Sequence, residues 1–157
     1  MDMSKHRRVL VIGVGHPQRG DDALGWHLVD ALRDRVPPNV EMRALSGEAT
    51  ALLEAWATAD AVVVVDAMMS NSDPGRIRRF DAIREALPRS GFGVSSHGFG
   101  VVEAIELGRR LDALPGSLII LGVEGRDFNL GAPLSPPVLR SLDEVGEAVL
   151  SEISAAC

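Results

Sequence analysis

The sequence predicts a single three-layer α/β/α domain on a mostly parallel, mixed five-stranded sheet. Apolar runs alternate with segments of helical periodicity, which is typical of βαβ units. One run holds four consecutive valines, from Val62 to Val65, as expected for a central strand buried on both faces. A chain of 157 residues, 46% of them hydrophobic, suffices for one sizeable core.

Short apolar or alternating runs mark five strands. They are expected at Val9 to Val14, Val40 to Leu45, Ala61 to Val65, Arg76 to Phe80 and Ser117 to Val123. The fourth run follows turn residues 71–75 and alternates like a half-buried edge strand. Its connection to the third strand is too short for a parallel crossover, so an antiparallel placement is expected.

Four segments have the periodicity of helices. In the first, Ala23, Leu24, His27, Leu28, Ala31 and Leu32 recur at helical spacing. Pro37 and Pro38 end that helix. The other three are expected at Glu48 to Ala59, about Val101 to Leu111 and about Pro137 to Ile153.

The composition limits the classes of partner and the cellular compartment that are expected for this protein. The net charge of -6 argues against nucleic acid and anionic membrane as partners, because such contacts need clustered Lys and Arg. The one basic cluster, Lys5 to Arg8, is expected to be part of a flexible tail over residues 1–8. No long apolar segment follows it, so a cytoplasmic protein is expected. The single cysteine, Cys157, allows neither a disulfide framework nor a thiolate zinc site within one chain.

The turn after the first strand is the most informative segment. Gly15 and Gly20 have the spacing of a phosphate-binding loop, but Asp21 and Asp22 stand where Lys and Ser or Thr would be needed. Two carboxylates would repel a nucleotide. They would attract a divalent cation or serve in acid-base chemistry.

A third acid, Asp66, closes the valine run. Ligands of open α/β sheets bind beyond the carboxyl ends of the strands, where Asp21, Asp22 and Asp66 are all expected. The alternative for Asp66, and for either Asp21 or Asp22, is a helix cap. The sequence alone does not say which member of the adjacent pair would be the cap.

Of the histidines, His97 is the strongest candidate for a site. It lies in a glycine-rich, apolar loop and would add a nitrogen ligand to the strand-end acids, a set that suits a borderline divalent metal. His27 shares a face with Leu24 and Ala31, so a partly buried structural role is expected for it. His16 lies in the first turn, and its role stays open.

Two other enzyme classes fit poorly. A serine hydrolase needs a Gly-x-Ser-x-Gly elbow, which is missing, and Ser95 and Ser96 merely adjoin His97. A dinucleotide fold needs a third glycine earlier than Gly20 and an acid at the end of the second strand.

Together, these motifs resemble the [NiFe]-hydrogenase maturation endopeptidases. The matching segments are Gly13 to Pro17, Gly20 to Gly25, Val64 to Ala67, Ser96-His97, Gly122 to Glu124, Asp127-Phe128 and Leu134 to Pro136. The resemblance implies a cytoplasmic, aspartic-type, metal-recognising endopeptidase. Such an enzyme removes a C-terminal extension from the hydrogenase large-subunit precursor after nickel insertion.

The resemblance also implies which residues act. The three metal-contacting positions of the family fall on Asp22, Asp66 and His97, and the nickel that they contact belongs to the precursor. No tightly bound metal is therefore expected in the isolated protein. His16 departs from the family, which usually has Asn there, and it is either a fourth ligand or part of a changed turn.

The chemical step is left open by the residues. Nickel could activate water or polarise the scissile carbonyl, or a carboxylate could be the general base. The rival functions are a non-catalytic nickel carrier and a nucleotide-binding module on the first turn.

Overall fold

The computed structural model describes residues 7–88, 91–92 and 100–157. The strands are β1 (Val9–Val14), β2 (Val40–Leu45), β3 (Ala61–Met68), β4 (Ile77–Asp81) and β5 (Ser117–Glu124). The helices are α1 (Leu24–Leu32), α2 (Ala49–Trp56), α3 (Val101–Arg110) and α4 (Pro136–Ala156). Two 3-10 turns, η1 (Gly20–Ala23) and η2 (Arg33–Arg35), flank α1.

The five strands form one mixed sheet in the order β2-β1-β3-β5-β4. β1, β2, β3 and β5 are parallel, whereas β4 pairs antiparallel with β5 at the edge of the sheet. This confirms the predicted fold class and the placement of the fourth strand.

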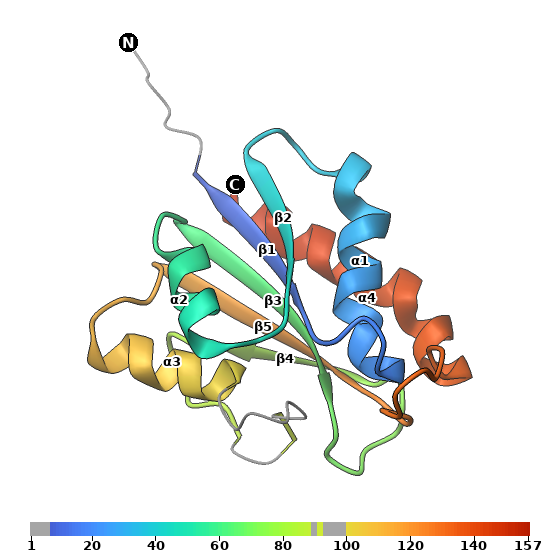
Figure 1. Cartoon of the computed structure of the whole chain (residues 1–157). Helices are drawn as coiled ribbons and strands as arrows, with labels where there is room; N and C mark the ends of the chain where they lie inside the picture. The colour runs from blue at the N-terminus through green and yellow to red at the C-terminus, as the bar shows by residue number, and fades with distance from the viewer. Residues whose placement is uncertain (1–6, 89–90, 93–99) are drawn as a thin grey trace.

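The helices cover both faces of the sheet (Figure 1), and a hydrophobic core lies on each face. On one face, α1 and α4 pack against the odd-numbered positions of β3, such as Val63 and Val65. On the other, α2 and α3 pack against Val62, Val64 and Met68. The valine run is therefore buried on both faces, as predicted. None of the described helices has the length and apolar character needed to cross a membrane.

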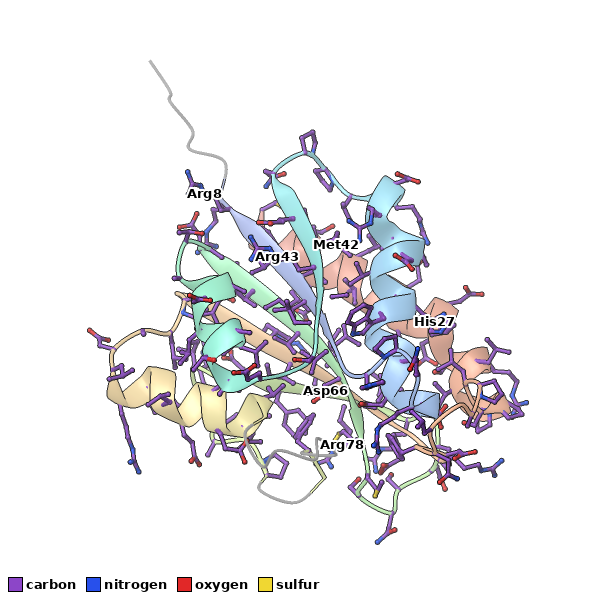
Figure 2. All side chains as sticks on the ribbon, in the orientation of Figure 1. Arg8, His27, Met42, Arg43, Asp66 and Arg78 are labelled. Carbon is purple, nitrogen blue, oxygen red and sulfur yellow. The ribbon has the colours of Figure 1, made fainter. Side chains whose placement is uncertain are left out.

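Two sequence-based expectations need correction. β3 continues to Met68 because its pairing with β5 extends to Met68 opposite Glu124, so Asp66 lies within the strand rather than after it. His27 is exposed, as is Ala31, because α1 turns Leu28, Val29 and Leu32 toward the sheet and α4. The expected partly buried role of His27 is therefore wrong (Figure 2).

The chain leaves the neighbouring strands β1 and β3 in opposite directions. After β1 it goes to β2, on one side, and after β3 it goes to β4 at the far edge on the other. A crevice for ligands is expected at such a switch point, beyond the carboxyl ends of the strands. Asp22 follows β1 and Asp66 lies near the end of β3, so the fold brings both to this place.

Candidate functional site

Asp22 is fixed by the turn that joins β1 to η1. The backbone amide of His16 donates a hydrogen bond of 2.9 Å to Oδ2 of Asp22, and only 8% of Asp22 is exposed. Gly15 has a φ of 146°, and a Cβ there would lie 1.8 Å from the carbonyl oxygen of Asp22. The turn therefore needs glycine at this position to bring the carboxylate back toward β1.

The turn is also held from α1. Nε1 of Trp26 donates to the carbonyl oxygens of Gly15, at 2.9 Å, and Leu45, at 3.3 Å. One indole therefore ties the ends of β1 and β2 together beside Asp22.

Asp66 projects from β3 on the face that carries Val62, Val64 and Met68, and it is 7% exposed. Burial raises the pKa of Asp66 well above its ordinary value, and the negative charge of Asp22 raises it further. A hydrogen bond from the Ala67 backbone opposes this shift. Figure 2 shows Asp66 at the opposite end of the sheet from Arg8.

The pKa of Asp22 is also raised, mainly by burial. The hydrogen bond from the His16 backbone and the charges of His16 and Arg19 act in the other direction. Two buried carboxylates that interact in this way are difficult to ionise together. A proton shared between them, or a bound cation, would relieve the repulsion.

Asp21 has a different role from its neighbour. Its Oδ2 accepts hydrogen bonds from the amides of Arg126, at 2.7 Å, and Asp127, at 3.0 Å, and from Oγ of Ser135, at 2.7 Å. Its Oδ1 accepts from the Ser135 amide at 2.7 Å, and the residue is fully buried. Asp21 thus ties η1 to the loop between β5 and α4.

The predicted alternative of a helix cap at the Asp21-Asp22 pair is wrong. Neither η1 nor α1 has a side-chain cap, and the residues at those cap positions are Arg19 and Ala23. Asp21 accepts hydrogen bonds from a distant loop, whereas the charge of Asp22 acts on Asp66.

Glu124 is a buried acid whose role the sequence analysis missed. Its carboxylate accepts hydrogen bonds from the amides of Ser70, at 2.9 Å, and Ser72, at 3.0 Å, and from the Ser70 hydroxyl. It holds the loop that follows β3. A signal was present, because Glu124 ends an apolar strand just as Asp66 follows a valine run.

Of the two histidines near the predicted site, the structure describes His16 only. His16 is exposed, and its Nδ1 accepts a 3.1 Å hydrogen bond from the Gln18 amide, an arrangement within the turn. His97 lies outside the described residues. The described Gly91 is joined to the end of β3 by a 2.8 Å hydrogen bond from the Met69 amide to the Gly91 carbonyl oxygen.

The described part of the chain contains no group of three His, Cys, Asp or Glu side chains that could hold a metal. Asp22 and Asp66 offer two carboxylates, and a cation there would need a further ligand. The pKa of both carboxyl groups is raised, that of Asp66 more strongly, and pairs whose pKa values are set apart in this way are typical of acid-base sites.

Comparisons with known proteins relate this chain to one family. The sequence profile of a family described as hydrogenase maturation protease matches residues 26–152. The chain is 30% identical to the hydrogenase expression/formation protein HupD of Bradyrhizobium diazoefficiens, over 86% of this chain and 72% of that protein. It is 27% identical to the hydrogenase 2 maturation protease of Escherichia coli, over 93% and 90% of the two chains.

The fold has solved counterparts. The hydrogenase maturating endopeptidase HybD from Escherichia coli superposes with a TM-score of 0.76 and 26% identity, covering 95% of this chain and 93% of that one. The [NiFe] hydrogenase maturation protease HybD from Thermococcus kodakarensis gives a TM-score of 0.72 at 21% identity, covering 93% and 99%.

Proposed function

Because this chain belongs to the hydrogenase maturation protease family and is therefore a peptide hydrolase, we propose that Asp22, Asp66 and His97 form its active site. The substrate is the large-subunit precursor of a [NiFe]-hydrogenase, from which the enzyme removes a C-terminal extension. The observation that carries the assignment is the interaction of two nearly buried carboxylates at the switch point of the sheet.

The nickel belongs to the substrate. In the isolated protein, burial raises the pKa of Asp66, and repulsion by Asp22 raises it further. A cation carried by the precursor would remove that repulsion and let both carboxylates ionise, so the pair favours a precursor that holds its metal over one that does not. His97 would supply the nitrogen ligand that the described residues lack.

Water is the proposed nucleophile. Cys157, the single cysteine, is exposed and its Sγ accepts a hydrogen bond of 3.5 Å from Nδ2 of Asn39. No carboxylate or imidazole of the described residues is hydrogen-bonded to it. The buried acids fit direct hydrolysis better, since an ionised carboxylate can accept a proton from water while its protonated neighbour donates one.

Release of a peptide tests the activity. The purified protein would be incubated with nickel-loaded large-subunit precursors encoded in the same genome, and the products measured by mass spectrometry. We expect one cut that separates the extension from the large subunit. Stable binding of the precursor without a cut would instead identify a nickel carrier.

The cytoplasm is the proposed compartment, as the family implies.

A further inference from the structure

Three arginines on and beside β4 differ in their partners. Arg79 forms an ion pair with Glu152, and Arg76 donates a 3.1 Å hydrogen bond to a serine hydroxyl. The side chain of Arg78 has neither an ion pair nor a hydrogen bond within the described ranges. Its guanidinium carbon lies 5.0 Å from the centre of the Phe80 ring, and the side chain is partly buried.

Arg78 lies on the same face of the sheet as the carboxylate site. Residue Gly122 of β5 is paired with Asp66 on one side and with Arg78 on the other, so the three stand in one row across the sheet. Phe80, two residues beyond Arg78, belongs to the core under α2 and α3, as do Val64 and Met68, which lie two residues before and after Asp66. Figure 2 shows Asp66 and Arg78 at the same end of the molecule.

The spacing suits a peptide. Adjacent strands lie about 4.8 Å apart, so Asp66 and Arg78 are separated by about 10 Å across the sheet. An extended peptide covers that distance in about three residues. A side chain or chain end three residues from the scissile bond would therefore reach the guanidinium group.

The side chains between Asp66 and Arg78 are apolar and nearly buried. A Cβ on Gly122 would lie 2.4 Å from Sδ of Met68 and 3.0 Å from the ring of Phe92, so these side chains cover the glycine. The rings of Phe80 and Phe92 meet edge to face, 5.6 Å apart. Arg78 is thus a cation stacked on an aromatic ring. Its apolar neighbours lower the local dielectric, which strengthens its attraction for an anion.

We propose that Arg78 is a specificity-determining residue that binds a carboxylate of the precursor, about three residues from the cleaved bond. A guanidinium group binds carboxylates with two parallel hydrogen bonds, and this one lacks a carboxylate partner among the described residues. The carboxylate belongs either to an acidic side chain near the cut or to the free C-terminus of the extension. The inference rests on the proposed function, since it assumes that a precursor peptide lies along this face.

Arg78→Met tests the inference, because methionine keeps an unbranched stem against Phe80 and loses the charge. Cleavage of the nickel-loaded precursor should show KM raised at least about tenfold, the loss expected for a charge-assisted hydrogen bond, with kcat within about twofold. Arg110→Met is the matched control: it removes the same charge from an exposed position at the end of α3, away from the site. It should leave both constants unchanged.

Precursor variants identify the carboxylate. Neutralising acidic side chains near the cut, one at a time, tests the first source, and extending the C-terminus by a few Gly and Ser residues tests the second. The correct change should reproduce the rise in KM with the wild-type enzyme and add nothing to Arg78→Met. Additive effects from every precursor variant would overturn the proposal.

Binding of the same precursor, measured by calorimetry, separates this inference from the proposed function. A wild-type protein that binds without cutting would contradict the protease assignment. The Kd of Arg78→Met relative to that of the wild type would still test whether Arg78 binds the precursor. The inference fails if Arg78→Met, with an unchanged melting temperature, keeps KM and Kd within about twofold of the wild type. It also fails if Arg110→Met weakens binding equally, or if the wild type does not bind.

Discussion

The carboxylates of Asp22 and Asp66 repel each other across the ends of neighbouring strands, and burial, reinforced by this repulsion, holds the pKa of Asp66 well above its usual range. The arrangement works against the stability of the isolated fold at neutral pH. It is suited to a site that meets a cation only when the substrate arrives.

Asp66→Asn should therefore stabilise the isolated protein at neutral pH. In the folded wild type, Asp66 keeps its proton at pH values where the unfolded chain, with a pKa of about 4, has lost it. The free energy of unfolding consequently falls as pH rises from about 4 through the raised native pKa. We expect the variant to melt at least about 2–4 °C higher at pH 7, the shift given by about 1 kcal/mol in a domain of this length.

Below pH 4 the two proteins should melt together, because Asp66 is protonated in both the folded and the unfolded wild type. Melting curves from pH 3 to 8 provide the check. An Asp66→Asn protein that is less stable than the wild type at pH 7 would show that the ionised carboxylate has stabilising partners.

Asparagine at either acidic position should abolish cleavage of the precursor. Asn at position 22 or 66 keeps the size of the side chain but removes the charge that attracts a cation. Cleavage of nickel-loaded precursor should fall at least about 100-fold in Asp22→Asn and in Asp66→Asn, with the fold intact. Near-normal processing by both folded variants would remove the acids from the site.

Asp21→Asn should behave in the opposite way. Both oxygens of Asp21 accept hydrogen bonds, so either orientation of an amide places an NH2 group against a backbone N-H or the Ser135 hydroxyl. We expect a loss of at least about 2 kcal/mol, since buried donors would be left unsatisfied. Urea unfolding beside Asp22→Asn makes the comparison. Equal stability of the two variants would argue against Asp21 as the tie between η1 and the β5-α4 loop.

His97→Ala tests a residue that the family resemblance assigns to the site. The variant should keep the wild-type melting temperature within about 2 °C and lose precursor processing, because a loop histidine that binds the substrate metal contributes little to the core. His27→Ala is the control, since His27 is exposed on α1 and should be dispensable. A folded His97→Ala protein that still processes precursor would contradict the three-residue assignment.

The sequence was sufficient for the sheet and for the approximate position of the acids. β1 begins and ends as predicted because an apolar run and a glycine turn are local signals, and the valine run indicated a central strand. The exposure of His27 was not predictable from spacing alone. It depends on the direction from which α4 packs against α1.

The different roles of Asp21 and Asp22 could likewise not be predicted from the sequence. Their sequence context is almost the same, and the partners of Asp21 lie more than 100 residues further along the chain, at Arg126 and Ser135. Such contacts exist only once β5 lies beside β3. Arg78 could not be singled out for the same reason, since its row with Asp66 depends on the register of β4.

Cleavage of apo- and nickel-loaded precursor, side by side, tests the central claim most directly. Metal content would be measured in both proteins before mixing. If Asp22 and Asp66 respond to a metal that the substrate carries, the loaded precursor is cut, the apo-precursor stays uncut at any enzyme concentration, and the isolated enzyme holds little metal. Equal cleavage of the two precursors, or a stoichiometric metal in the purified enzyme, would contradict the account.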